Sequence, residues 1–360
     1  MDAIFFPRND YPSNIEVCSH RLGKRMTYTE QTDTLGTSTS YSSFMALAKN
    51  RNIKTGCFLR LDSPVNNADA KADYENGKIW FDAYSFAPNI ADKIINPSQY
   101  GSITEEEWET AYNNYILPNF LGLVGRKPVC LSYSYGTVNF SDYITQFLGG
   151  RNSAVSNDTD YGYGLGTPDD KDYTFTRFSS KANTMRWYDQ AKSNDNDFLG
   201  QLAIVSAKID ETLLNGGWLN NFTHWHNYYS DNNGQWAEAY LDLLAAKNQN
   251  GEIYFSGYGE AVAYLVYRQM ITRCVMYSPV KNHNNQLVIR LETDNSVLGV
   301  DTDLLQTPIS VKFTTENTPL EGMSIRCENR NLIGLGNNQY IVEIPFGRFP
   351  VAVLISTSNS

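Results

Sequence analysis

Long apolar runs, clusters of basic residues and paired cysteines are all missing from this sequence of 360 residues. No stretch approaches the roughly 20 apolar residues that a helix needs to span a membrane. Only 19% of the residues are charged, and 39 Asp and Glu outnumber 29 Lys and Arg, which gives a formal net charge of −10. Because binding to a phosphate backbone requires clustered Lys and Arg, we expect no nucleic-acid partner.

The cysteines are five in number and have no short paired spacing, which argues against a disulfide framework and against a cysteine-based zinc site. Residues 1–8 lack a basic start followed by a long apolar core, so we expect no secretory signal there, unless the start has been trimmed. We therefore expect a protein that is either cytoplasmic or part of a virion or surface assembly.

Polar aromatic residues are abundant. Hydrophobic residues make up 41% of the chain, enough to bury a core, and 13% are aromatic, including 24 tyrosines. A surface rich in Asn, Ser, Thr, Tyr and Gly suits hydroxyl-rich ligands, because amides and hydroxyls hydrogen-bond to sugars and flat rings stack on them. Genome-level composition bias explains the same numbers, so both interpretations stay open.

Short apolar strands alternate with helical stretches through the first three-quarters of the chain, which predicts a parallel α/β architecture, most simply a barrel. The expected strands are residues 25–29, 55–61, 78–81, 129–133, 173–178, 218–224 and 252–256. The expected helices are residues 42–49, 105–121, 140–148, 202–214, 236–247 and 260–272. Thr104 should cap the helix 105–121, whose first turn is acidic.

After about residue 275 the pattern changes to short alternating strands separated by turns. These strands are residues 286–291, 309–314, 323–327, 339–344 and 350–355. The chain is longer than one compact core, so we expect a barrel over residues 1–275 and a small all-β sandwich over residues 276–360. The sandwich would mediate contacts in a protein assembly.

Histidine is scarce, with four in the chain, yet His224 and His226 lie two residues apart at the end of the expected strand 218–224. The carboxyl ends of barrel strands carry the active site. Because side chains alternate along a strand, only one imidazole should face the barrel mouth, as a general acid or a ligand-binding group. Two hydrogen-bonded structural histidines are the alternative. The ligand-binding residues expected beside them are Trp225, as a sugar platform, Asn227 and Tyr228.

Tyr133 and Tyr135 alternate with serine on an expected strand, so one face of that strand could present phenol groups to a ligand; core packing is the alternative.

Three blocks of the sequence, taken in order, resemble the polysaccharide deacetylase family. They are residues 26–30 with 42–49 and 53–58; residues 131–139 (LSYSYGTVN) with 149–151 (GGR); and residues 216–226 (GGWLNNFTHWH) with 251–255 (GEIYF).

The resemblance covers about residues 20–275 and implies a deacetylase-like (β/α) barrel that acts on polysaccharide with a divalent metal. It also implies that Arg151 orients a carboxylate at the site; a surface ion pair is the alternative. Active members carry an adjacent Asp pair after the first strand, where this chain has residues 27–33 (TYTEQTD), with Glu30 and Asp33 as the only carboxylates. The two metal-binding histidines of the family correspond here to Asp82 and Phe86.

A phenylalanine cannot bind a metal, and one carboxylate does not replace two imidazoles for zinc. Without the metal, water is not made nucleophilic at neutral pH, so we expect the usual deacetylation to be lost. A rebuilt site of Asp33, Asp82 and His226 would suit a harder divalent ion than zinc.

Three functions compete. In a carbohydrate esterase, His226 would be the acid and a carboxylate the base, with His224, Asp33 and Asp82 as the further catalytic candidates. In a degenerate barrel, polar and aromatic side chains would hold a polysaccharide or oligosaccharide without catalysis, and this is the interpretation we favour. In a structural component of a larger assembly, such as a virion, the C-terminal domain would make the contacts.

Overall fold

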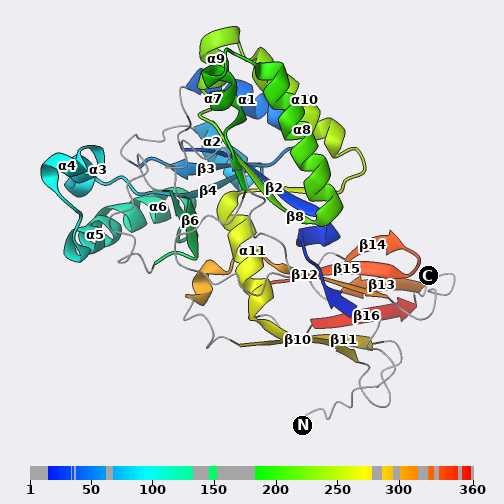
Figure 1. The fold of residues 1–360 in the computed structure, drawn as a ribbon. Coiled ribbons are helices and arrows are strands. Elements are labelled where there is room, and N and C mark those ends of the chain that lie inside the picture. Colours follow the sequence, from blue (N-terminus) through cyan, green and yellow to red (C-terminus); the bar gives the residue numbers. More distant parts are fainter. Residues whose placement is uncertain are drawn as a thin grey trace. The chain divides into compact units, whose positions relative to one another are not determined.

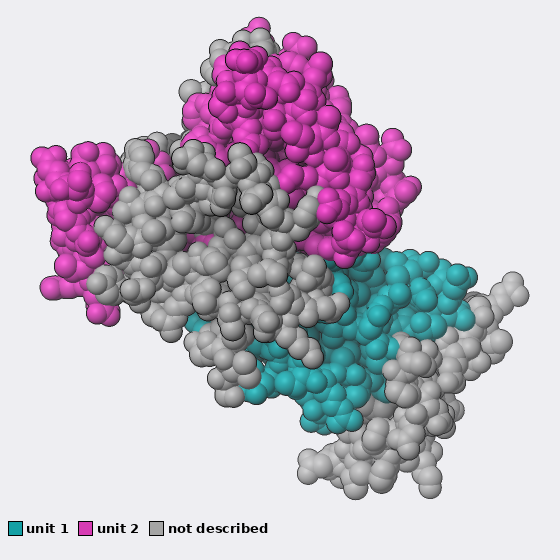
Figure 2. Space-filling view, in the orientation of Figure 1, with its two compact units in different colours: residues 1–24, 264–360 teal, residues 25–263 magenta. Residues whose placement is uncertain are grey.

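The computed structural model describes residues 15–33, 35, 38–61, 68–132, 146–151, 183–277, 286–294, 301–314, 323–327, 332–347 and 351–357. The chain splits into two compact units, residues 25–263 and residues 1–24 with 264–360 (Figure 2). This division differs from the expected boundary after residue 275. The N-terminal strand β1 (Ile15–Val17) pairs with a strand near residue 310, so the start of the chain belongs to the second unit.

The unit of residues 25–263 is built on a parallel sheet with the order β6-β5-β4-β3-β2-β8-β7, in which β9 also pairs with β2 (Figure 1). Every strand pair in it is parallel. The strands are β2 (Met26–Thr32), β3 (Thr55–Leu59), β4 (Ile79–Tyr84), β5 (Cys130–Ser132), β6 (Gly149–Arg151), β7 (Asn183–Met185), β8 (Gly217–Phe222) and β9 (Ile253–Ser256).

One long-range hydrogen bond shows that this sheet curls. Asp33 directly follows β2, and its Oδ1 accepts a hydrogen bond of 3.3 Å from the Oγ of Ser132 at the end of β5. In the sheet order β3 and β4 lie between these strands, and a flat sheet would hold β2 and β5 about 14 Å apart. Asp33 and Ser132 therefore lie on a concave face, and the curled sheet agrees with the barrel-like α/β fold expected from the sequence.

The helices of this unit are α1 (Ser38–Asn50), α2 (Ala68–Glu75), α3 (Ala91–Ile95), α4 (Pro97–Tyr100), α5 (Glu105–Ala111), α6 (Leu117–Val124), α7 (Trp187–Ser193), α8 (Phe198–Asn215), α9 (Asn227–Asn232) and α10 (Gln235–Lys247). The helix α11 (Tyr258–Met270) begins in this unit. Figure 1 shows α1, α8 and α10 grouped beside β2 and β8. No helix among the described residues is long and apolar enough to cross a membrane.

The expected cap at Thr104 is present as a reciprocal pair. Thr104 Oγ1 accepts from the N–H of Glu107, and the Glu107 carboxylate accepts from the N–H of Thr104 at 2.8 Å. The predicted helix 105–121 is one continuous stretch with a wider π turn at Tyr112–Ile116 between α5 and α6. The widened turn lies just before Pro118, which has no N–H to donate to an α-helical partner.

The second unit contains two four-stranded antiparallel sheets, with the orders β1-β12-β15-β14 and β10-β11-β16-β13. Its strands are β10 (Ile271–Tyr277), β11 (Gln286–Thr293), β12 (Ile309–Thr314), β13 (Met323–Cys327), β14 (Leu332–Gly336), β15 (Gln339–Ile344) and β16 (Val351–Thr357). The five strands expected after residue 275 are all present at these places. Asn337 and Asn338, both with positive φ, form the turn between β14 and β15.

Two predicted elements are not found as expected. Residues 140–145 of the helix predicted at 140–148, and the whole strand predicted at 173–178, lie outside the described residues. Residues 146–148 are described and are not helical; the N–H of Leu148 instead donates to the carbonyl of Val129 at 2.9 Å, which leads the chain into β6.

Candidate functional site

The alternation of side chains along β2 separates two environments. Thr29, Gln31 and Asp33 are every second residue and share the concave face, because Asp33 meets Ser132 there. Tyr28 and Glu30 point the other way, toward the helices: the hydroxyl of Tyr240 in α10 lies 2.6 Å from both the Tyr28 hydroxyl and the Glu30 Oε2. The two carboxylates singled out in residues 27–33 are therefore on opposite faces of the sheet and cannot act together.

Glu30 is completely buried in a network of donors. Its Oε2 accepts from Tyr240 and, at 2.7 Å, from the side-chain amide of Asn221; its Oε1 accepts from the Nε1 of Trp225 at 3.3 Å. Burial raises the pKa of Glu30 to about 7, although the hydrogen bonds from these three side chains favour the ionised form and lower it. Glu30 ties β2 and β8 to the helix layer and is remote from the concave face.

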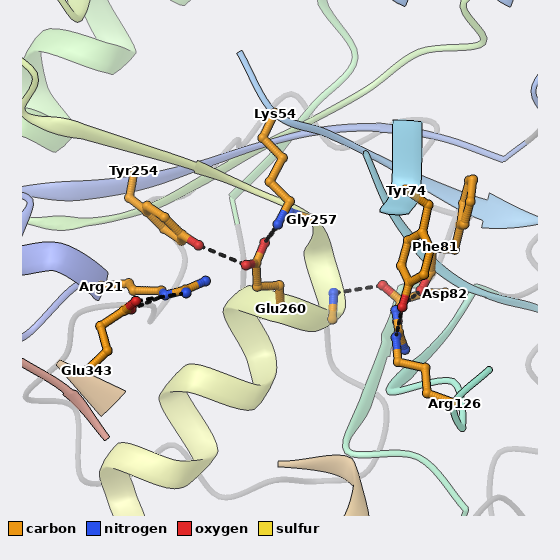
Figure 3. Close-up of polar contacts among 11 residues, drawn as sticks. Arg21, Lys54, Tyr74, Phe81, Asp82, Arg126, Tyr254, Gly257, Glu260 and Glu343 are labelled. Atoms are coloured by element: carbon orange, nitrogen blue, oxygen red, sulfur yellow. Dashed lines mark hydrogen bonds and ion pairs between the residues drawn. The ribbon is translucent and has the colours of Figure 1, made fainter. Parts of the chain in front are cut away.

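Asp82 stands in the middle of β4 and is 1% exposed. Its Oδ1 accepts from the N–H of Cys130 at 3.1 Å, and its Oδ2 accepts from the N–H of Gly259 at 2.8 Å. Figure 3 shows the Asp82 side chain beside the start of α11. Burial raises the pKa of Asp82 to about 6, and the nearby positive charge of Arg126 opposes that shift. Asp82 thus joins β4, β5 and the first turn of α11, so both of its oxygens serve the fold.

A second buried carboxylate anchors the same helix. Glu260 accepts from the hydroxyl of Tyr254 at 2.8 Å and pairs with the Nζ of Lys54 at 2.6 Å, and Figure 3 shows all three side chains pointing toward one another. Lys54 precedes β3 and Tyr254 lies in β9, so the start of α11 is fixed to two strands. This cluster holds the fold together at the place where β9 and β3 both approach β2.

His224 and His226 lie together at the carboxyl end of β8. The strand ends at Phe222, so the expected alternation stops there and the imidazoles are on the same side, with ring centroids 5.4 Å apart. The alternation expected for a continuing strand does not apply to them, because the chain leaves the strand at Thr223. His224 packs edge-on against Phe222, a concave-face residue, at 5.2 Å.

His226 is exposed and directly precedes α9. Partial burial lowers its pKa, and the charge of Asp189 works against that shift. A lowered pKa leaves the imidazole neutral at pH 7, which does not favour the general-acid role expected for it. Asp189 itself pairs with Arg186 at 2.6 Å, and the Arg186 guanidinium lies over the Phe222 ring at 5.4 Å.

Trp225 and Tyr228 were expected to contact a ligand, but both are fully buried. The Trp225 indole stacks on Phe44 of α1 at 4.5 Å, and Phe44 also stacks on Tyr228 at 5.7 Å. Neither ring offers a face to a sugar, because the chain turns inward after His224 to cover α1. We leave both out of the proposed site. Asn227 is half-buried and begins α9.

The other expected residues are placed only in part. Tyr133 and Tyr135 lie outside the described residues. Arg151 is the last residue of β6, in register with Ser132, so its backbone lies at the same carboxyl edge of the sheet. Phe86, at the second position where the family has a metal-binding histidine, is buried beneath the guanidinium of Arg60 at 4.9 Å.

The residues present do not fit the divalent metal that the resemblance implies. Both oxygens of Asp82 accept backbone hydrogen bonds, Glu30 faces the helices, and Phe86 has no ligand atom. Within the described part of the chain, no three His, Cys, Asp or Glu side chains gather in a way that could hold a metal ion. This argues against a rebuilt metal site made of Asp33, Asp82 and His226, so we derive no catalytic step that uses a metal.

Two residues of the concave face were missed in the sequence. Ser132 holds Asp33, and Gln31 is completely buried with neither its Nε2 nor its Oε1 bonded to any described residue. Gln31 lies over Gly56 of β3, where an added Cβ would come within 2.4 Å of its amide nitrogen. Gln31 could have been found from the sequence, because it lies two residues before Asp33 and side chains two apart on a strand share a face.

No family model and no curated protein sequence matches this chain. Among solved structures it is similar to a polysaccharide deacetylase from Bacillus cereus (TM-score 0.38, 11% identity, 65% of this chain and 92% of that one). It is also similar to a family 4 carbohydrate esterase from Streptomyces lividans, solved with acetate (0.38, 10%, 64% and 91%). A third is a peptidoglycan deacetylase from Bacillus subtilis (0.36, 10%, 68% and 93%). At these TM-scores and identities the likeness carries no argument about activity.

Proposed function

We propose that residues 25–263 form a deacetylase-like domain that binds a polysaccharide or oligosaccharide at the carboxyl edge of its sheet and does not perform metal-dependent deacetylation. The observation that carries the proposal is that the buried carboxylates of this sheet accept hydrogen bonds from the protein itself. Glu30, Asp33 and Asp82 each accept internal hydrogen bonds. The exposed or half-buried polar groups that the structure describes at this edge include His224, His226 and the Arg186–Asp189 pair.

This edge suits a sugar better than a catalytic cycle. The two imidazoles and the ion pair offer both donors and acceptors, and Phe222 supplies an aromatic ring beneath them. A neutral hydroxyl-rich ligand requires such mixed groups and no strong electrostatic field. The net charge of −10 agrees with a neutral ligand more than with an acidic one.

A glycan array probed with the purified protein tests the proposal, followed by calorimetric titration of the best neutral oligosaccharide. The variant His224→Ala/His226→Ala should weaken binding about tenfold or more, because it removes two hydrogen-bonding groups. Asn76→Ala, an exposed change that precedes β4 at the opposite edge of the sheet, should leave the affinity unchanged. An array without any saccharide preference would refute the proposal.

A second candidate function is a role in a protein assembly through the second unit, whose two sheets we infer to pack as a sandwich. Ile333 and Leu335 favour it, since they are 38% and 47% exposed on β14, an edge strand without a charged residue. Replacing both with lysine should reduce self-association in sedimentation velocity if this edge makes contacts. Unchanged sedimentation of a protein that does associate would contradict it.

A further inference from the structure

Gln31 is a residue of the concave face whose buried polar atoms the fold leaves without partners. It is 0% exposed, and its carboxamide nitrogen and oxygen have no hydrogen-bond partner among the described residues. A buried amide without partners is strongly unfavourable, so such a group is kept only where something else satisfies it. Its neighbours on the same face are bonded to one another: Thr29 Oγ1 donates to Asn220 Oδ1 at 2.6 Å, and Asp33 accepts from Ser132.

A second orphaned group lies beside it. Ser256, the last residue of β9, is in register with Thr29 and therefore shares the concave face with Gln31, and its Oγ is also buried without a partner. The two residues are diagonal neighbours across β2 and β9. Together they present a hydroxyl and a carboxamide, which offer donors and acceptors and no charge.

Space for the carboxamide comes from the neighbouring strand. Gln31 is in register with Gly56 of β3, and any Cβ at that position would overlap the Gln31 side chain. The glycine lets the amide lie over the strand. This arrangement is specific to a neutral side chain, since an ionised group without partners in the same buried place would be far more costly.

We propose that Gln31 binds the ligand, with its carboxamide donating from Nε2 and accepting at Oε1 between two adjacent hydroxyls of a neutral pyranose, and with Ser256 as a second contact. The inference rests on the proposed glycan-binding function and deepens it. The concave face of the sheet would bind an uncharged sugar through its hydroxyl groups, and not a cation. Gln31 is then a binding residue that determines specificity.

The test compares Gln31→Met with the wild-type protein in two measurements. Without ligand, the melting temperature should rise by at least about 2 °C, because an unpartnered buried amide is replaced by an apolar side chain of similar shape. In calorimetric titrations with xylotetraose and chitotetraose, the same variant should bind about tenfold more weakly. Gln146→Met is the matched control: the Gln146 Oε1 accepts from Trp108 Nε1 at 3.2 Å, so this change should not stabilise the protein and should leave the affinity unchanged.

The outcomes separate the two proposals. A wild-type protein that binds neither tetrasaccharide nor any other glycan overturns the proposed function, and the sugar role of Gln31 with it. If the wild-type protein binds and Gln31→Met binds equally well, only the inference about Gln31 is overturned. A variant that is less stable than the wild type and keeps its affinity shows that the amide is satisfied within the fold, for example by water.

Discussion

At the scale of single residues, the chemistry of this protein depends on which face of the sheet a side chain occupies. Glu30 and Asp33 are three positions apart, yet one is held by Tyr240, Asn221 and Trp225 on the helix side and the other by Ser132 on the concave side. A carboxylate held by three donors within the interior is a structural group, even with a raised pKa.

Glu30 should make stability depend on pH. Its pKa is raised from 4.5 to about 7 in the folded protein, so its contribution is fully present below about pH 4.5 and is lost as the pH rises through 7. The loss amounts to about 3 kcal/mol. In Glu30→Gln this contribution disappears, so the fall in unfolding free energy between pH 5 and pH 8, measured with urea, should shrink by about 2 kcal/mol.

Glu106→Gln is the control for that measurement, because Glu106 is exposed in the first turn of α5. Its pH profile should follow that of the wild-type protein. An identical fall in stability for wild type and Glu30→Gln would show that Glu30 does not ionise in this range.

Asp82→Ala should destabilise the protein by roughly 2 kcal/mol, since it leaves the buried N–H groups of Cys130 and Gly259 without an acceptor. Asp82→Asn keeps one acceptor and should lose about half as much. Urea unfolding at pH 7 measures both. If either variant kept full stability while releasing a bound metal, the structural role assigned to Asp82 would be wrong.

Sequence reasoning located strands and helices well and side-chain partners poorly. The strand predicted at residues 25–29 is part of β2, which extends to Thr32. The partner of Asp82 is Gly259, which lies 177 residues away and has no local signal. Trp225 was predicted to be an exposed platform for a sugar. It is buried because its ring stacks on Phe44 of α1, a contact between distant parts of the sequence that no local pattern shows. Which face of β2 is concave follows only from the curl of the whole sheet.

At the scale of elements, the start of α11 is held by two buried carboxylates, Asp82 and Glu260. Asp82 accepts a hydrogen bond from Gly259 in the first turn of the helix. The N–H groups of a first turn have no acceptor within the helix, and the helix dipole favours a negative charge there. Glu260 then joins the same turn to Lys54 and Tyr254. Helix α11 is thus fixed by two buried carboxylates to β3, β4, β5 and β9.

Gly259→Ala should therefore be strongly destabilising, by about 2 kcal/mol or more, because the new Cβ would lie 2.2 Å from Asp82 Oδ1. Gly122→Ala in α6 is the matched control: its Cβ would meet nothing within 4 Å, so the change should stabilise by about 0.5–1 kcal/mol through helix propensity. Thermal unfolding of both variants measures the contrast. Equal effects would mean that the close approach of Asp82 to α11 is absent in solution.

At the scale of the whole molecule, a curled parallel sheet holds Glu30, Asp33 and Asp82 in internal hydrogen bonds. The low charge noted in the sequence agrees with this, since the described polar groups at the carboxyl edge include two imidazoles, one ion pair and a carboxylate, Asp33, that is held by Ser132. The second unit contains two antiparallel sheets, one of which includes β1.

The most direct test of metal-free glycan binding is a calorimetric titration of one neutral oligosaccharide into protein treated with a chelator and into protein supplied with zinc or manganese, with acetate release followed in parallel on an acetylated substrate. We expect the same affinity in every sample, no tightly bound metal after desalting, and no release of acetate. One tightly bound metal per chain, with acetate release that the chelator abolishes and the metal restores, would contradict it.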